Sequence, residues 1–325
     1  MKKSNEPIFR VVDYSVVLKD SDGKPLPIIE NISFCLNKGK CLGIAGESGS
    51  GKSVLVMSSL GLVPKASIEK REGQVFFKNE EVFESNKLKG IMGKNIGFIF
   101  QEPMTAMNPL MTLYEQISET VKTHMPELTR SEVKERVINS LKQSGFDEPE
   151  KFLSSYPHQL SGGMRQRAMI AMAIVLEPEL IVADEPTTAI DAELQIQVLT
   201  ELRKRINSGN CGIIFISHDL GVMRAVSDEI AILYCGCLVE KGPTEQVLTN
   251  PMHPYTKALI NALPRLIEER KIPESISGTL PSPDNKPKGC VFSTRCKMVK
   301  DDCLKSRPSL RQVGEDRFSA CLFDL

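Results

Sequence analysis

The apolar pattern of the N-terminal part predicts three strands and a helix. The segments from Phe9 to Leu18 and from Ile28 to Leu36 are short, rich in β-branched residues and bounded by Asp-Gly and Lys-Gly turns, which predicts antiparallel strands. A third, apolar strand from Lys40 to Ala45 ends where a run of glycines begins. From Gly51 to Leu62 the apolar spacing suits a helix, and Pro64 stops it.

Helical periodicity dominates the middle of the chain. Apolar residues recur three and four positions apart in Leu113, Ile117 and Val121, then from Val133 to Leu141, and again from Met164 to Glu177. We interpret the stretch of about residues 105–178 as a helical lobe inserted between the glycine-rich turn and a later strand.

Three short apolar strands lie around this lobe, at Ile96–Phe100, Leu180–Ala183 and Ile213–Ile216. Each is followed by polar residues: Gln101 after the first, Asp184 after the second, and Ser217-His218 after the third. This recurrence predicts a parallel α/β sheet whose strand ends face one ligand crevice.

The composition changes after Pro251. A helix from Tyr255 to Lys271 is predicted, with a kink or break at Pro264, and the later prolines punctuate a tail with little strand or helix signal. A chain of 325 residues suits two domains better than one. We therefore divide it into residues 1–250 and a small loop-rich domain of residues 251–325.

Charge and hydropathy narrow the class of protein. Lysine plus arginine and aspartate plus glutamate both number 41, so no global field attracts nucleic acid, and nucleic-acid binding is disfavoured. The apolar runs are far shorter than the ~20 residues that cross a bilayer, and the start Met1–Asn5 is not followed by an apolar signal region. A cytoplasmic protein is expected, whose nine cysteines are thiols or metal ligands rather than disulfides.

The glycine-rich turn between strand and helix predicts a phosphate-binding loop. Its glycines let the backbone turn tightly and point N–H groups at a β-phosphate, and the helix N-terminus adds positive potential. Lys52 is expected to bridge β- and γ-phosphate oxygens, and the Ser53 hydroxyl to ligate Mg²⁺. The predicted loop consists of Gly46, Glu47, Ser48, Gly49, Ser50, Gly51, Lys52 and Ser53.

Two carboxylates and a histidine follow later strands. Asp184 ends an apolar strand, where its carboxylate can hold magnesium, and Glu185 is then placed to orient an attacking water. His218 lies at a strand end, where an imidazole could contact the γ-phosphate. Ser161-Gly162-Gly163 opens a helix and predicts a second anion-binding cap.

Together these motifs resemble those of the ATP-binding subunits of ABC transporters. Gly46–Ser53 is similar to the Walker A motif, Leu160–Gln166 to the signature, and Leu180–Asp184 to the Walker B motif. Likewise Gln101 resembles the Q-loop, Glu185 the catalytic glutamate, Ala189–Asp191 the D-loop and His218 the switch histidine.

The resemblance implies a P-loop ABC ATPase with an antiparallel β subdomain, a parallel core sheet and the inserted helical lobe. It implies ATP and Mg²⁺ as cofactors, with Ser53, Gln101 and Asp184 as magnesium ligands and Asp191 in the nucleotide site. It also implies a head-to-tail dimer in which each ATP lies between the Walker A motif of one cassette and the signature of the other.

Two further segments narrow the branch. Phe100–Pro109 and His253–Thr256 are similar to the oligopeptide, dipeptide and nickel importers. This resemblance implies a second ATP-binding subunit, different from this chain or identical to it, and two transmembrane permease subunits that pack near residues 101–109. A solute-binding protein outside the cell is an indirect partner, and the subunit is peripheral on the cytoplasmic face of the membrane. Di- or oligopeptides are the expected cargo, with nickel or another metal chelate as the alternative.

Other functions fit the sequence less well. A soluble, non-transport ABC ATPase is expected to carry two cassettes or a long coiled coil, and this chain has one cassette. A non-hydrolysing regulatory cassette is disfavoured by the presence of Glu185 and His218. Two positions depart from the family pattern. Leu18 replaces the aromatic residue that stacks on adenine, and Ile190 of the D-loop stands where leucine is common, a volume-conserving change that we expect to be harmless.

The tail holds four cysteines, Cys290, Cys296, Cys303 and Cys321, in a proline-rich segment with too little apolar content for its own core. The close Cys-x₂₋₄-Cys pairs of zinc sites are absent here. The layout resembles peptide importers whose C-terminal domain holds a [4Fe-4S] cluster, which makes a cluster the expectation and leaves zinc or free thiols open. Elsewhere, His124, His158 and His253 are expected at the surface, and Cys35, Cys41 and Cys211 in the core.

Overall fold

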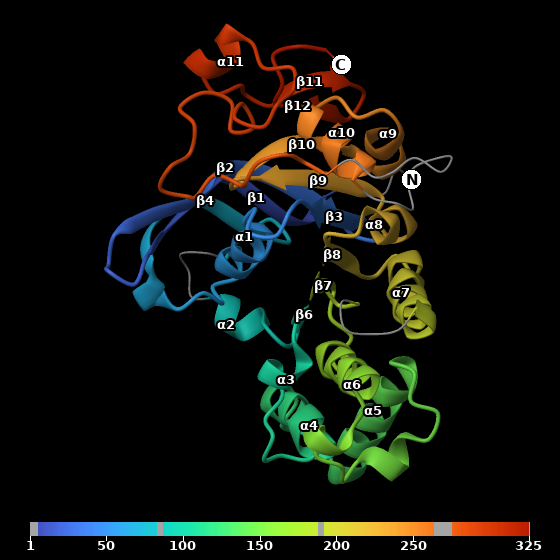
Figure 1. The fold of residues 1–325 in the computed structure, drawn as a ribbon. Coiled ribbons are helices and arrows are strands. Elements are labelled where there is room, and N and C mark those ends of the chain that lie inside the picture. The colour runs from blue at the N-terminus through green and yellow to red at the C-terminus, as the bar shows by residue number, and fades with distance from the viewer. Residues whose placement is uncertain (1–5, 83–86, 188–191, 263–274, 325) are drawn as a thin grey trace. The chain divides into compact units, whose positions relative to one another are not determined.

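The computed structural model describes residues 6–82, 87–187, 192–262 and 275–324. The chain forms two compact units, whose elements are labelled in Figure 1. The helical unit comprises residues 1–8, 37–40 and 86–214, and the sheet unit comprises residues 9–36, 41–85 and 215–325. Among the described residues, no helix is both long enough and apolar enough to cross a membrane.

Two parallel strands position the chemistry of the helical unit. In β6 (Ile96–Ile99) and β7 (Leu180–Asp184), Ile96 lies opposite Leu180 and Ile99 opposite Ala183. Every residue of β7 is buried, as the continuous apolar run predicts for a strand covered on both faces. The predicted parallel pairing is confirmed, and the third predicted strand is β8 (Gly212–Ile216).

The predicted helical lobe is also confirmed. Figure 1 shows α3 (Pro103–Ala106), α4 (Leu113–His124), α5 (Arg130–Gln143) and α6 (Gly162–Ile174) gathered together. The periodic apolar residues of α4 and α5 are buried in one core with residues of α6. Short 3₁₀ turns at Pro149–Phe152 and Pro157–Gln159 connect α5 to α6, and the unit also contains α2 (Leu88–Ile91) and α7 (Ala192–Asn207).

Capping residues set where α4 and α5 begin. The backbone N–H of Thr112 donates to the Glu115 carboxylate at 2.7 Å, and the Thr112 side chain accepts from the Glu115 N–H. Thr129 and Glu132 form the same capping box in α5. Each box satisfies two backbone donors that a helix start leaves free.

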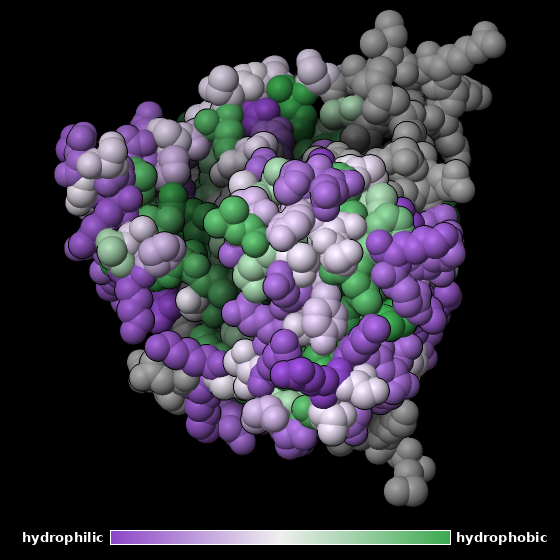
Figure 2. All heavy atoms as spheres, turned by 90° about the horizontal axis from the view of Figure 1, so that it is seen from below, coloured by the Kyte–Doolittle hydropathy of each residue, from purple (hydrophilic) through white to green (hydrophobic). Residues whose placement is uncertain are grey.

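In the view of Figure 2, hydrophilic residues predominate on the surface and hydrophobic residues form smaller areas between them.

The sheet unit contains strands of two β-sheets. In the first, the strand order is β2 (Pro25–Asn37), β1 (Pro7–Lys19), β4 (Ile68–Phe77) and β5 (Glu80–Glu81), with β1 antiparallel to β4. In the second, the order runs β11 (Arg311–Gly314), β12 (Arg317–Ser319), β10 (Cys237–Pro243), β9 (Glu229–Tyr234) and β3 (Cys41–Ala45). The β3–β9 pair is parallel, and the other pairs among these five strands are antiparallel.

Short helices complete the sheet unit. They are α1 (Lys52–Ser59), the 3₁₀ turn Lys65–Ser67, α8 (Leu220–Val226), α9 (Thr244–Thr249), α10 (Pro254–Asn261) and α11 (Asp301–Lys305). As predicted, α1 ends before Pro64. The predicted helix from Tyr255 begins as α10, and its continuation through residues 263–271 lies outside the described residues.

The tail has more regular structure than its sequence signal suggests. The three-residue strand β12 pairs with the edge of β10, where Ser319 lies opposite Glu240 and Phe318 opposite Lys241. So short a strand has almost no pattern of its own, and it forms because β10 offers unpaired backbone groups along its edge.

Two predictions about side-chain burial, for Cys35 and His253, were wrong. Cys35 is exposed because neighbouring strand residues face opposite sides, and Phe34 and Leu36 take the buried side of β2. His253 is fully buried, with its ring centroid 6.1 Å from that of Phe292, and as the N-cap of α10 its Nδ1 accepts a hydrogen bond from the Tyr255 N–H at 3.1 Å. Cys41 and Cys211 are buried as predicted.

Candidate functional site

The predicted phosphate loop follows β3 and leads into α1 in the sheet unit. Gly49 and Gly51 have φ of 81° and 100°, in the left-handed region that favours glycine. At Gly46 an added Cβ would lie 2.2 Å from the Leu233 carbonyl oxygen. The loop therefore passes too close to the end of β9 for any side chain at this position.

Lys52 lies against the loop that precedes it. Its side chain is 6% exposed, and its Nζ donates to the carbonyl oxygens of Gly46 at 2.9 Å and Glu47 at 3.0 Å. The ammonium is thus fixed within the turn formed by the loop, where a phosphate held by the loop's N–H groups would meet it.

In the helical unit, Gln101 and Glu185 meet beyond the ends of β6 and β7. The Gln101 side-chain amide donates to the Glu185 carboxylate at 3.1 Å, and the neighbouring Asp184 is buried. Glu185 has φ of 47°, a conformation that non-glycine residues rarely adopt and that is frequent at functional sites. Two residues separated by the whole helical lobe are brought together because their strands are parallel neighbours.

The predicted signature forms the start of α6. Ser161 is its N-cap and accepts a hydrogen bond from the Met164 N–H at 3.3 Å, with Gly162 and Gly163 in the first turn. The Gln166 side-chain amide donates to the Pro186 carbonyl at 2.6 Å. This bond connects α6 to the segment that carries Glu185, a link that sequence reasoning missed.

The last two predicted site residues are His218 and Asp191. His218 follows β8 in the sheet unit and is exposed, while the adjacent Asp219 caps α8 through its Oδ1, which accepts from the Gly221 N–H at 2.8 Å. Asp191 lies outside the described residues.

The four tail cysteines line one pocket with His253. Burial raises the pKa of the Cys290 thiol to about 11, and the nearby Cys303, Cys296 and Cys321 add to the rise. The buried Nε2 of His253 has no hydrogen-bond partner within the described residues. Over the same residues, no group of three or more histidine, cysteine, aspartate or glutamate side chains has metal-binding geometry.

Comparisons with known proteins agree with the motifs. Residues 29–188 match the ABC transporter family, and residues 239–303 match the oligopeptide/dipeptide transporter C-terminal region. The chain is 38% identical to the oligopeptide transport ATP-binding protein AppD of Bacillus subtilis, covering 92% of this chain and 91% of that protein. It is 36% identical to the dipeptide transport ATP-binding protein DppD of Escherichia coli, covering 97% and 96%.

A solved structure gives the same result for the fold. The ATP-binding cassette MJ0796, a dimer in a post-hydrolysis state bound to ADP and Pi, matches with a TM-score of 0.65 and 25% identity. The match covers 73% of this chain and 98% of that one. With relatives similar over nearly its whole length, and with both family regions present, the chain belongs to the ATP-binding subunits of ABC transporters, in the oligopeptide/dipeptide branch.

Proposed function

We propose that this chain binds and hydrolyses ATP as a subunit of an ABC importer whose cargo is di- or oligopeptides. The observation that carries the chemistry is the Gln101–Glu185 hydrogen bond of 3.1 Å beside the buried Asp184. A carboxylate held by an amide next to a second acid is suited to orient a water near a magnesium-bound phosphate. The cargo is supported by the names of the two relatives above, which refer to oligopeptide and dipeptide transport.

Each predicted site residue has a role in this proposal. Residues 46–53 hold the phosphates of ATP, and Ser53, Gln101 and Asp184 are the ligands for Mg²⁺. When bound, the ion would neutralise charge on the phosphate oxygens. Glu185 orients and polarises the attacking water, and His218 contacts the γ-phosphate. Ser161, Gly162, Gly163 and Asp191 act across a dimer interface, with the signature serving the partner's nucleotide.

The proposed partners are a second ATP-binding subunit, different or identical, and two permease subunits. The dimeric state of the cassette MJ0796 supports the second ATP-binding subunit as a partner. Exposed apolar side chains of the helical unit support the permease subunits as partners. Leu110 is 84% and Met104 is 54% exposed, and Phe100 and Tyr156 are also exposed. Such apolar groups suit a protein interface. The subunit would then be peripheral on the cytoplasmic face, and a solute-binding protein would act on it only through the permeases.

For the tail we propose a domain of residues 251–325 in which Cys290, Cys296, Cys303 and Cys321 hold a [4Fe-4S] cluster. The donor set supports this, because four thiols and an unpartnered histidine nitrogen share one pocket and thiolates are the usual ligands of such clusters. Bound iron would stabilise a segment that has little apolar core of its own.

Anaerobic purification tests the cluster through the iron content and the absorbance near 400 nm. Iron should be lost in a Cys303→Ser variant and retained in Cys35→Ser, which changes an exposed thiol on β2. Folded protein with no iron above background, or with zinc in its place, would exclude the cluster.

A Glu185→Gln variant tests the ATPase proposal. In the assembled transporter it should lower ATP turnover about 10²–10⁴-fold, the range that a general base contributes, and still bind MgATP. Glu135→Gln, at an exposed position of α5, is the control and should keep full turnover. Unchanged turnover in Glu185→Gln would remove this residue from the mechanism.

A further inference from the structure

Glu47 of the phosphate loop is bonded through its side chain, its backbone N–H and its backbone carbonyl. Its carboxylate accepts two hydrogen bonds from Arg295, at 2.8 Å from Nη1 and 3.1 Å from Nη2. Its backbone N–H donates to the Tyr255 hydroxyl at 2.8 Å, and its carbonyl accepts from Lys52 at 3.0 Å. Two of these three partners come from the proposed C-terminal domain, and all of them lie in the sheet unit.

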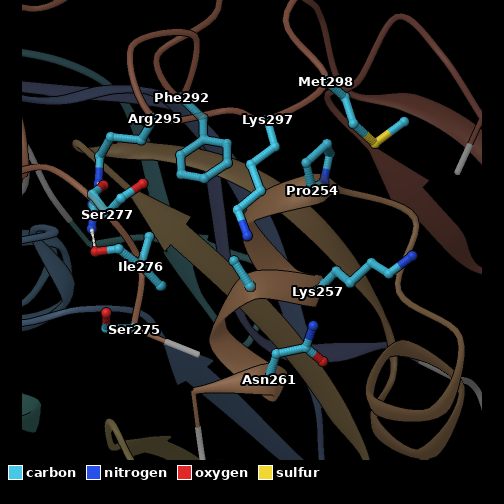
Figure 3. A pocket seen from close by; sticks show the side chains of 11 residues that line it. Pro254, Lys257, Asn261, Ser275, Ile276, Ser277, Phe292, Arg295, Lys297 and Met298 are labelled. Atoms are coloured by element: carbon cyan, nitrogen blue, oxygen red, sulfur yellow. Dashed lines mark hydrogen bonds between the residues drawn. The ribbon is translucent and has the colours of Figure 1, made fainter. Parts of the chain in front are cut away.

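Arg295 is itself fixed in place. Its side chain is 5% exposed, and it donates to the Ser277 carbonyl at 2.9 Å, the Ile276 carbonyl at 3.3 Å and the Tyr234 hydroxyl at 3.3 Å. Figure 3 shows its guanidinium directed toward Ser277 and Ile276. A planar guanidinium with this many partners presents a preorganised two-pronged donor to a carboxylate.

An aromatic cluster packs around Tyr255 and Arg295. The rings of Tyr234, Tyr255 and Phe292 lie with centroids 4.5 to 5.3 Å apart, distances typical of favourable aromatic pairs. They come from the end of β9, from α10 and from the tail. The tail also approaches the loop at a second point, because a Cβ on Gly49 would lie 3.4 Å from Leu280 Cδ2.

The charge of Glu47 gives these contacts a consequence for nucleotide binding. A carboxylate in a loop that cradles a triphosphate opposes the ligand unless a cation compensates it, and the effect is strong where solvent is scarce. Arg295 supplies that cation within hydrogen-bonding distance.

We propose that Arg295, with Tyr255, is a positioning residue that holds Glu47 and keeps the phosphate loop in its ligand-binding conformation. The C-terminal domain then takes part in nucleotide binding without touching the nucleotide. This inference rests on the part of the proposed function that assigns ATP binding to residues 46–53.

The test is the affinity of the full-length chain for MgATP, measured by displacement of a fluorescent ATP analogue. Arg295→Gln should weaken binding at least tenfold, because it leaves the Glu47 carboxylate without its cation. Arg295→Lys should keep part of the affinity. Glu47→Gln should lose less affinity for MgATP than Arg295→Gln. The double variant should bind MgATP as tightly as Glu47→Gln alone, since removing the carboxylate removes the need for the arginine.

Salt separates this role from a general loss of structure. The deficit of Arg295→Gln should shrink between 0.05 and 0.5 M NaCl, because ions screen the uncompensated carboxylate. Lys286→Gln is the matched control. It breaks another ion pair of the tail, the 2.8 Å contact with Glu30 on β2, and should change affinity less than twofold.

The outcomes distinguish the two proposals. If Lys52→Ala abolishes MgATP binding and Arg295→Gln leaves it unchanged, the positioning role is wrong and the nucleotide site stands. Equal losses in Arg295→Gln and Lys286→Gln also overturn the positioning role. Normal binding in Lys52→Ala contradicts the nucleotide site itself. Should Arg295→Gln not fold, the double variant decides. The positioning role predicts that removing the Glu47 carboxylate restores folding and that the double variant binds MgATP like Glu47→Gln, whereas a double variant that still fails to fold or binds more weakly overturns it.

Discussion

Glu240 and Arg317 form a buried ion pair in the sheet unit. Arg317 Nη2 donates to the Glu240 carboxylate at 3.0 Å, and their side chains are 9% and 0% exposed. The same carboxylate accepts from the Met252 N–H at 2.8 Å. The pair therefore ties β12 of the tail to β10, and neither group has ready access to water.

An Arg317→Met variant should lose about 3–5 kcal/mol of unfolding free energy, because it leaves a buried carboxylate without its cation. Burial already raises the pKa of Glu240 above its ordinary value, and removal of the arginine raises it further. In the folded variant the Glu240 carboxyl keeps a proton that it releases in the unfolded chain. The loss of unfolding free energy should therefore be smaller at pH 5 than at pH 7.5. Urea denaturation at the two pH values measures it.

The control for that experiment is Lys305→Met at the exposed Lys305–Asp302 pair. Exposed pairs contribute little, so no measurable change is expected. Similar losses in the two variants would show that the burial of Glu240 has no energetic consequence.

At the scale of single residues, the sequence predicts a motif of consecutive residues but not contacts between residues far apart in the chain. The phosphate loop was predictable because all its residues are consecutive. Arg295 and Tyr255 were not, because they lie 248 and 208 residues from Glu47 in sequence. No local pattern records such a contact.

At the scale of elements, the helical lobe depends on a narrow apolar stripe. Ile117 of α4 is completely buried in the lobe core, whereas Glu119 on the same helix is exposed. Replacing Ile117 by alanine should destabilise the lobe by about 2–5 kcal/mol, because it removes buried apolar atoms and leaves a cavity.

Hydrogen exchange of the α4 and α5 amides measures this effect locally. Exchange should accelerate in Ile117→Ala, while Glu119→Ala should exchange like the unmodified protein. Unchanged protection in Ile117→Ala would mean that the lobe is not held by this core.

Elements with strong periodicity were predicted well, and for a physical reason. Helices α4 and α5 bury the residues spaced at three and four positions, and the first four residues of β7 are apolar because both faces of this strand are covered. The tail elements α11, β11 and β12 span five, four and three residues. They depend on tertiary neighbours, so no sequence window contains the information that forms them.

At the scale of the whole molecule, the proposed function requires two cassettes to meet. A Glu185→Gln chain with its partner ATPase subunit should form a stable dimer with MgATP, because it binds nucleotide and turns it over slowly. Adding Ser161→Arg should prevent dimerisation, since a bulky side chain would occupy the signature cap that faces the partner's nucleotide. Size-exclusion chromatography with light scattering gives the mass.

Ser131→Arg, at an exposed position near the start of α5, serves as the matched change elsewhere in the same unit and should leave the dimer intact. A dimer that persists in the Ser161→Arg chain contradicts the role of the signature.

The hydrogen bond of 2.6 Å from Gln166 to the Pro186 carbonyl has a consequence for an assembled transporter. In the proposed head-to-tail dimer, the α6 end of this connection would lie near the γ-phosphate held by the neighbouring chain, and the other end adjoins Glu185, the residue proposed to orient water for the chain's own ATP. The two hydrolysis events would then be cooperative, and each subunit would transmit the occupancy of one site to the reactivity of the other.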